Sequence, residues 1–156
     1  MEVHDKVDFT LQDEQEQTVH LADFKGKPVV LFFYPKADTP GCTIEACGFR
    51  DTFKKIQAAG AVVLGISRDT PKAQKKFKEK YDLPYQLLAD VDEVVCKQFG
   101  VLKEKNMYGK KVMGIERTTY LIGPDQRIAK IFPKVKPEGH AEEVLAAIKE
   151  YKAAAK

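Results

Sequence analysis

Two continuous apolar runs, separated by enough residues for a helix, constrain the fold most. The first is Val29–Tyr34 (VVLFFY) and the second is Ala61–Ser67 (AVVLGIS). Neither run alternates between apolar and polar residues, so both are typical of strands that are buried on both faces of a sheet. Because both faces of such strands need a helical cover, the two runs predict an α/β domain.

Helix signals follow each of these strands. Pro35 ends the first run, and a helix is expected from Pro40 to Ala59, with Gly60 in the position of a C-terminal cap. Asp69-Thr70-Pro71 has the pattern of a helix start and precedes a helical stretch over Lys72–Tyr81. The order strand, helix, strand, helix is therefore expected over the first half of the chain.

The remaining segments complete a recognisable order. We predict an N-terminal hairpin, a short helix, a C-terminal hairpin and a last amphipathic helix. The two arms of the first hairpin are Val7–Leu11 and Thr18–Leu21, with the polar run Gln12–Gln17 between them; the short helix is Asp92–Phe99; the later strands are Gly114–Ile122 and Arg127–Phe132, joined by the turn Gly123–Gln126; the last helix is Pro137–Lys152. This order predicts a thioredoxin-like fold with an N-terminal β-hairpin extension and a central mixed sheet flanked by helices, in a single domain over residues 1–156.

Charge and hydropathy exclude several kinds of partner. The formal net charge is only +3, from 26 basic and 23 acidic residues, and the lysines are scattered, which favours a solvated surface over nucleic-acid binding. The longest apolar run is far shorter than a membrane span, and the first residues lack a signal-peptide pattern. We therefore expect a cytoplasmic protein with no nucleic-acid or membrane partner. The densest basic stretch is Lys103, Lys105, Lys110 and Lys111.

The position of Cys42 gives it the strongest chemical signal. Pro40 suits the first position of a helix, which makes Thr39 the N-cap and places Cys42 in the first turn. Unpaired backbone N–H groups and the positive end of the helix dipole lie there, and both favour a thiolate over a thiol. The alternative is that Cys42 only fills a small space near the helix start.

Cys47 lies five residues further along the same helix. Five residues rotate a side chain by ~140° and raise it by ~7.5 Å, so the two Cα atoms are ~8–9 Å apart in an intact helix. A disulfide needs a separation below about 7 Å. If Cys42 and Cys47 form a disulfide, the first turns of the helix must therefore unwind; otherwise Cys47 is a buried cysteine on the helix face.

Metal and cofactor sites are disfavoured. The cysteine spacing is not C-x-x-C, and His4, His20 and His140 lie far from the cysteines in sequence. The chain has no glycine-rich phosphate loop or dinucleotide fingerprint. We expect no metal and no organic cofactor. The third cysteine, Cys96, stands beside Val94 and Val95 in a pattern typical of burial, and we predict a structural role for it.

Several separated motifs carry a resemblance to a known family. Pro35-x-x-x-Thr39-x-x-Cys42 is similar to the active-site signature of peroxiredoxins. The run from Phe33 to Asp51, together with Lys103–Lys110 and Gly114–Thr119, resembles the bacterioferritin comigratory protein (Q-type) branch. The sequence departs from that branch near its start, where Val7 replaces the usual proline and the turn at 13–17 lacks the usual glycine. These departures bear on the geometry of the N-terminal hairpin.

The resemblance implies a thioredoxin fold and a peroxidase that reduces hydrogen peroxide and organic hydroperoxides. It further implies that Cys42 is the peroxidatic cysteine and Cys47 the resolving one, that Thr39 and Arg117 orient the peroxide and activate the sulfur, and that Pro35 shields the pocket. The implied reductant is thioredoxin, and members of this branch are often monomers.

The residues around Arg117 leave its role open. Arg117 is expected inside the strand Gly114–Ile122, where Ile115 and Thr119 share its face. A buried guanidinium needs an anionic partner, which a thiolate would supply. The opposite face is also half apolar, so the alternation does not determine the direction of the side chain, and a solvated arginine is the alternative.

Two other functions compete with a peroxidase. A thiol–disulfide oxidoreductase suits the fold, but it requires a C-x-x-C motif at the helix start, which this sequence lacks. A redox sensor or a chaperone-like binding protein requires only slow reaction of Cys42 with peroxide and a stable complex with a partner.

Overall fold

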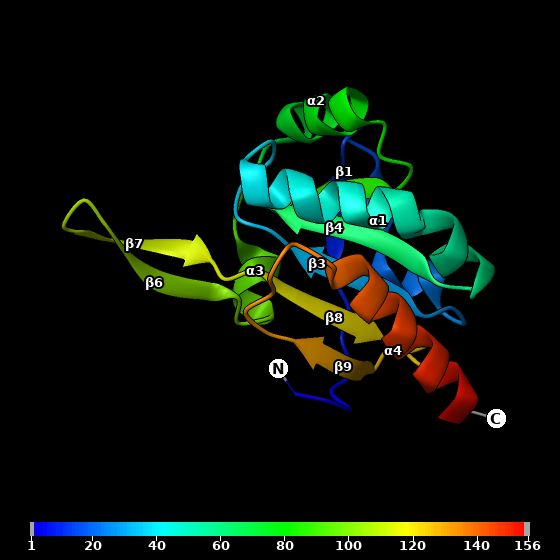
Figure 1. Cartoon of the computed structure of the whole chain (residues 1–156). Coiled ribbons are helices and arrows are strands. Elements are labelled where there is room, and N and C mark those ends of the chain that lie inside the picture. The colour runs from blue at the N-terminus through cyan, green and yellow to red at the C-terminus, as the bar shows by residue number, and fades with distance from the viewer. Residues whose placement is uncertain (1, 155–156) are drawn as a thin grey trace.

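The computed structural model describes residues 2–154 and confirms the α/β prediction (Figure 1). The strands of the main sheet are β1 (Thr10–Asp13), β2 (Thr18–His20), β3 (Val29–Phe33), β4 (Val62–Ser67), β5 (Gln86–Ala89), β8 (Thr118–Ile122) and β9 (Ile128–Phe132). A separate hairpin consists of β6 (Leu102–Met107) and β7 (Lys110–Ile115). The helices are the 3-10 helix η1 (Leu21–Phe24) and the α-helices α1 (Pro40–Ala58), α2 (Pro71–Tyr81), α3 (Val94–Gln98) and α4 (His140–Ala154).

The main sheet is mixed, as the sequence predicts. Its seven strands have the order β2-β1-β5-β4-β3-β8-β9. β3 pairs with β4 and β4 pairs with β5 in parallel, whereas β8 is antiparallel to β3 and β9 is antiparallel to β8. Two parallel strands joined through a helix, followed by an antiparallel hairpin and a final helix, form the thioredoxin-like core.

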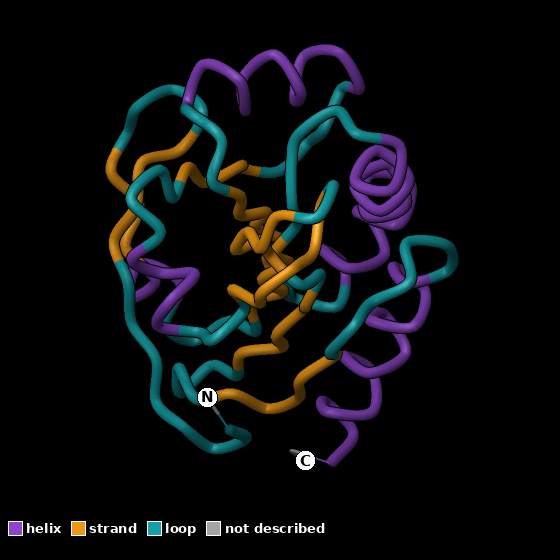
Figure 2. The backbone as a smooth tube through the Cα atoms, turned by 90° about the vertical axis from the view of Figure 1, so that its left-hand side faces the viewer, coloured by secondary structure: helices purple, strands orange, loops and turns teal. Residues whose placement is uncertain are grey.

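Strand β3 separates two hydrophobic clusters. Val30 and Phe32 belong to the cluster under α1 and α4, whereas Val29, Leu31 and Phe33 belong to the cluster on the other face, with α3. All five residues are fully buried, which explains the continuous apolar run. Helices therefore lie on both sides of the strands (Figure 2).

The N-terminal hairpin forms despite the departures from the family pattern. Its first strand is Thr10–Asp13, so the prediction of a strand over Val7–Leu11 was wrong in its boundaries. Asp13 Oδ1 accepts hydrogen bonds from the backbone N–H groups of Gln15 and Gln17 and so closes the turn. Glu16 has a φ of 61°, the left-handed conformation that glycine usually supplies.

Two features of the second half correct the prediction. The residues predicted as one strand, Gly114–Ile122, are divided between β7 and β8, because the chain leaves the β6–β7 hairpin at Ile115 and enters the main sheet at Thr118. The predicted elements also omitted β5 and β6. The β6–β7 hairpin projects from the body of the protein (Figure 1), and its two-residue turn, Tyr108-Gly109, has positive φ at both positions.

The helices match the prediction except at their ends. α3 covers only Val94–Gln98 of the predicted Asp92–Phe99, and α4 begins at His140, three residues after the predicted start at Pro137. Thr70 caps α2, since its hydroxyl accepts a hydrogen bond from the Ala73 N–H. Within residues 2–154, none of the helices combines the length and the hydropathy needed to cross a membrane.

Candidate active site

The N-terminus of α1 holds Cys42 as the sequence predicts. Thr39 is the N-cap, with extended φ and ψ of −91° and 157°, and Pro40 is the first helical residue. Cys42 is therefore in the first turn, where the backbone N–H groups have no acceptor within the helix. Its side chain lies under the helix at the edge of the core and is 1% exposed.

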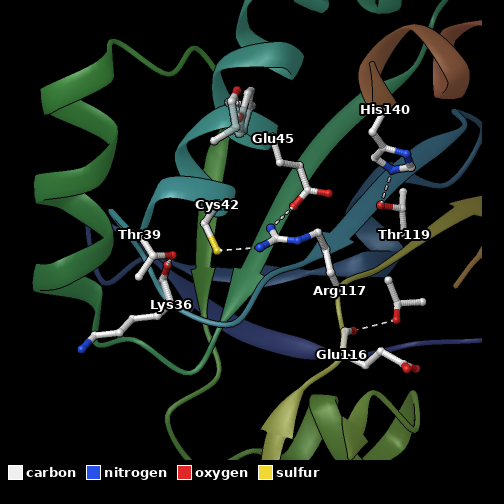
Figure 3. Close-up of polar contacts among 11 residues, drawn as sticks. Lys36, Thr39, Cys42, Glu45, Glu116, Arg117, Thr119 and His140 are labelled. Atoms are coloured by element: carbon white, nitrogen blue, oxygen red, sulfur yellow. Dashed lines mark hydrogen bonds and ion pairs between the residues drawn. The ribbon is translucent and has the colours of Figure 1, made fainter. Parts of the chain in front are cut away.

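The Thr39 side chain does not cap the helix. Its hydroxyl instead donates a hydrogen bond to the Lys36 carbonyl at 2.8 Å (Figure 3), while the Thr39 carbonyl accepts the first helical bond from the Thr43 N–H. This hydrogen bond closes the short loop between β3 and α1. The hydroxyl oxygen keeps acceptor capacity for another group near Cys42.

Arg117 approaches Cys42 from the link between β7 and β8. Its Nη2 atom lies 3.4 Å from Cys42 Sγ, and its Nη1 atom donates to Glu45 Oε1 at 2.8 Å (Figure 3). The expectation that Arg117 lies inside a strand was wrong, because β7 ends at Ile115 and β8 begins at Thr118. The side chain is only 15% exposed and points toward the sulfur, so the solvated alternative does not hold.

Glu45 is a buried carboxyl that the sequence analysis did not single out. It lies one turn after Cys42 on α1 and is 1% exposed. Burial raises its pKa to about 7, although the Arg117 guanidinium acts in the opposite direction. Among the described residues, its Oε2 atom is the one buried side-chain atom without a hydrogen-bond partner. The spacing from Cys42, three residues on a helix, was the available signal.

The close approach of Arg117 to the helix depends on Gly41. A methyl group at this position would lie 2.9 Å from Arg117 Nη2 and 3.5 Å from the ring of Pro137. The backbone of Arg117 is held in place because its carbonyl accepts a hydrogen bond from the Val135 N–H at 2.9 Å. Only the end of the Arg117 side chain can therefore yield to a larger residue at position 41.

We expect Gly41→Ala to slow the reaction of Cys42 with hydrogen peroxide by about tenfold, a fraction of the ~10²–10³ that a well-placed donor contributes to such a reaction. The added methyl displaces the guanidinium from the sulfur without disturbing the core. Rapid-quench mass spectrometry of Cys42 oxidation measures this rate. The matched control is Gly48→Ala on the same helix, where the new methyl makes an ordinary contact of 3.6 Å with Ala141. Equal oxidation rates for Gly41→Ala and Gly48→Ala would show that the approach of Arg117 to Cys42 does not depend on the absence of a side chain at position 41.

The loop before α1 is anchored to α2 and to the loop that precedes it. The Ala37 N–H donates to Asp69 Oδ2 at 2.8 Å. Asp38, which has a φ of 61°, accepts hydrogen bonds from Lys80 Nζ and from the Tyr81 hydroxyl, and both contacts lower its pKa. Pro35 is half-buried directly after Tyr34, whose side chain is fully buried. These contacts fix the path of the chain into the first turn of α1.

Cys47 lies in the middle of an intact α1 and is half-buried. Burial raises the pKa of its thiol, while the nearby Arg50 guanidinium acts in the opposite direction. The carbonyl of the preceding residue, Ala46, accepts a hydrogen bond from the buried Tyr85 hydroxyl at 2.7 Å. Both cysteines are free thiols on one continuous helix, so the closed helix keeps them apart as predicted.

Cys96 is remote from these residues. It belongs to the hydrophobic cluster on the α3 side of the sheet, whereas Cys42 belongs to the cluster on the α1 side. It is fully buried, and its pKa is raised by burial and by its hydrogen bond to Asp90. This burial agrees with the structural role predicted for Cys96.

His140 is a second buried polar residue near the site that the sequence analysis did not assign. Its Nε2 atom lies 2.8 Å from Thr119 Oγ1, and its ring packs edge-on against Phe49 and Phe132. Burial, assisted by the Arg117 charge, lowers its pKa to about 4, so the imidazole is neutral at physiological pH. A lone histidine at a helix start carries no sequence signal for this placement.

Comparison with known proteins identifies the family of the chain. The family model described as AhpC/TSA matches residues 3–131. The putative peroxiredoxin bcp of Coxiella burnetii is 55% identical over 137 residues, which cover 88% of this chain and 91% of that protein. Peroxiredoxin Bcp of Bacillus subtilis is 45% identical over 143 residues, covering 92% of this chain and 91% of that protein.

Two solved structures give the same result. A variant of peroxiredoxin Q from Xylella fastidiosa superposes with a TM-score of 0.93 at 38% identity, covering 97% of this chain and 98% of that chain. The bacterioferritin comigratory protein of Xanthomonas campestris superposes with a TM-score of 0.88 at 41% identity, covering 92% and 91%. The chain therefore belongs to the AhpC/TSA family and is a peroxiredoxin, a thiol peroxidase, of the bacterioferritin comigratory protein (Q-type) branch.

Proposed function

We propose that this peroxiredoxin reduces hydrogen peroxide and organic hydroperoxides through a sulfenic acid on Cys42, followed by a Cys42–Cys47 disulfide that thioredoxin reduces. The observation that carries the proposal is the guanidinium of Arg117, which contacts Cys42 Sγ at the N-terminus of α1. In this proposal Cys42, Cys47, Thr39, Arg117 and Pro35 form the active site of one peroxiredoxin domain over residues 1–156.

In the first step, the Cys42 thiolate attacks the terminal oxygen of the hydroperoxide. The new S–O bond forms as the O–O bond breaks, which leaves a sulfenic acid on Cys42 and releases an alkoxide or hydroxide that takes up a proton as alcohol or water. Arg117 Nη2 and the free N–H groups of the first helical turn are placed to stabilise this developing charge. The Thr39 hydroxyl, half-exposed at the helix start, orients the peroxide, and Pro35 shields the sulfur from water.

In the second step, α1 opens at its start and Cys47 attacks the sulfenic sulfur. The Cys42–Cys47 disulfide forms, and the sulfenic oxygen leaves as water. The opening is required because the closed helix holds the two Cα atoms ~8–9 Å apart. Thioredoxin then supplies two electrons by thiol–disulfide exchange and restores both thiols. These two protein sulfurs carry the whole redox cycle, so no metal or organic cofactor takes part.

Three further observations support the proposed substrates, the cytoplasmic location and the monomeric state. The Xanthomonas campestris protein is described by its alkyl peroxide reduction activity, which favours organic hydroperoxides as substrates. A cycle that ends in reduction by a thiol protein suits the reducing cytoplasm. We further propose that the protein acts as a monomer, because both sulfurs of the proposed disulfide lie on one helix.

We expect Cys47→Ser to consume about one equivalent of hydrogen peroxide and then to stop with Cys42 oxidised, because the remaining thiol, Cys96, belongs to the core cluster on the other face of the sheet. Peroxide consumption with thioredoxin and its reductase, followed by mass spectrometry, measures this stoichiometry. Cys96→Ser is the control and should turn over fully, since the sheet separates Cys96 from Cys42. Sustained turnover of Cys47→Ser with thioredoxin would refute the resolving role of Cys47.

A further inference from the structure

Glu45 lies on α1 between the two cysteines of the proposed disulfide. It belongs to the turn that must open before Cys47 can reach Cys42, and it is 1% exposed in the closed helix. Its Oε1 atom pairs with Arg117, while Oε2 is buried without a partner (Figure 3). A buried carboxylate with one unsatisfied oxygen is unfavourable for the closed helix, since water would solvate both oxygens.

The contacts around α1 divide it into two parts. Residues near Cys47 are held by the Tyr85 hydroxyl at the Ala46 carbonyl, and by Arg50, whose Nη1 atom donates to the Tyr81 carbonyl at 2.9 Å. Phe49 is fully buried and stacks on Phe32 at a centroid distance of 4.7 Å. The first turns bury no aromatic ring of their own, and Arg117 contacts both of their buried polar side chains, Cys42 and Glu45. The part that opens therefore contains both Cys42 and Glu45.

We propose that the ionised Glu45 carboxylate promotes the opening of the first turns of α1, so that its loss of a proton favours the conformation in which Cys42 and Cys47 can meet. The proposal deepens the disulfide mechanism above and rests on it for its biological meaning. In the closed helix the carboxylate loses water on one oxygen, and in the open helix it regains that water. Protonation of Glu45 removes this penalty and stabilises the closed helix.

The sign of the pH dependence follows from the burial. The pKa of Glu45 is about 7 in the closed helix, against 4.5 for an ordinary glutamate, which an opened segment would restore. The open form therefore releases the proton more readily, and the opening equilibrium constant should rise by about 20-fold between pH 5.5 and 7.5 by proton linkage. Below the ordinary pKa this effect vanishes, because both forms are protonated.

The other side chains around Glu45 with shifted pKa values do not titrate in this range. On α1 the pKa of Cys47 is raised, and the link to β8 contributes Arg117, whose pKa is raised as well. Before β5, burial raises the pKa of Tyr85 well above 10, as it does for Tyr34 after β3. At the start of α4, the pKa of His140 is lowered to about 4.

Amide hydrogen exchange in a Cys42→Ser background tests the proposal, because this background removes the Cys42 thiol and with it all peroxide chemistry. Protection of the amides in residues 43–47, which are bonded within the helix, gives the opening constant at pH 5.5 and 7.5 after correction for intrinsic exchange. We expect a rise of about 20-fold with Glu45 and a nearly constant value in Glu45→Gln, which still accepts a hydrogen bond from Arg117. Glu142→Gln, an exposed glutamate on α4, is the matched control and should behave like the parent.

Two results would overturn the proposal. A constant opening constant in the parent would mean that Glu45 does not influence the helix, and an equal rise in Glu45→Gln would assign the pH dependence to another group. Neither result would touch the peroxidase cycle, since the experiment requires no turnover. Conversely, if Cys47→Ser turned over fully and so refuted the resolving role of Cys47, the opening constant measured by amide exchange would not change.

Discussion

Replacement of Cys42 by serine should abolish peroxide turnover and leave the fold unchanged. A serine hydroxyl is not ionised at neutral pH and cannot form a sulfenic acid, so the first step has no nucleophile. Serine has nearly the volume of cysteine, and its oxygen can accept the hydrogen bond that Arg117 Nη2 directs at Cys42 Sγ. Loss of activity would therefore come from the chemistry and not from a cavity or an unpaired polar group.

The measurement is the rate of peroxide consumption with dithiothreitol as reductant, together with a thermal unfolding curve. We expect the rate of Cys42→Ser to equal the background without protein and its unfolding temperature to match the parent. Cys96→Ser provides the comparison, because it changes a cysteine on the opposite side of the sheet and should keep full activity. Residual turnover above background in Cys42→Ser would assign the peroxidatic role elsewhere.

The second large effect is expected at Arg117. Arg117→Gln should slow the oxidation of Cys42 by about 10²–10³, the usual loss when one charge-stabilising donor is removed from an active site. Arg117→Lys should lose less, because it keeps the cation but cannot contact Cys42 Sγ and Glu45 Oε1 with separate nitrogens, as the guanidinium does. A rate of Cys42 oxidation that falls from the parent to Arg117→Lys and further to Arg117→Gln would indicate that a positive charge acts at the sulfur.

Rapid-quench oxidation at several peroxide concentrations gives the second-order rate constant for each variant. The fold should survive, because Glu45 can take up a proton when its partner is lost. Arg68→Gln is the control, since Arg68 also pairs with a glutamate, Glu93 at 3.7 Å, and its other hydrogen bond goes to the Met113 carbonyl and not to Cys42. Rate constants for Arg117→Gln that match this control would remove Arg117 from the site.

The sequence predicts the fold well where burial dominates the pattern. The continuous runs that became β3 and β4 are buried on both faces, and the helix start at Thr39-Pro40 has the residues that such a position requires. The short strand β5 has a weaker signal, since its four residues follow a turn and include only three buried positions. The residues Gly114–Ile122 are divided between two sheets because the β6–β7 hairpin projects from the rest of the protein. Local residue preferences do not predict such a projection.

The same distinction applies to the candidate site, where local sequence determines some positions and tertiary structure determines the others. Cys42 and Thr39 are placed by local rules at the start of a helix, so their positions follow from the sequence. Arg117 lies 75 residues away from Cys42 in the chain, and its contact with the sulfur depends on tertiary structure. The burial of Glu45 and the space at Gly41 depend on the same arginine, and neither shows in the sequence as more than a spacing.

The most direct test is the rate at which hydrogen peroxide oxidises Cys42 in a variant that carries Cys47→Ser and Cys96→Ser. Mass spectrometry after rapid quenching follows the sulfenic acid at neutral pH. We predict a second-order rate constant at least about a thousand times that of a free cysteine thiolate, because the guanidinium and the helix N-terminus together stabilise the displaced charge. A rate constant equal to that of free cysteine would contradict the assignment of Cys42 as the peroxidatic residue.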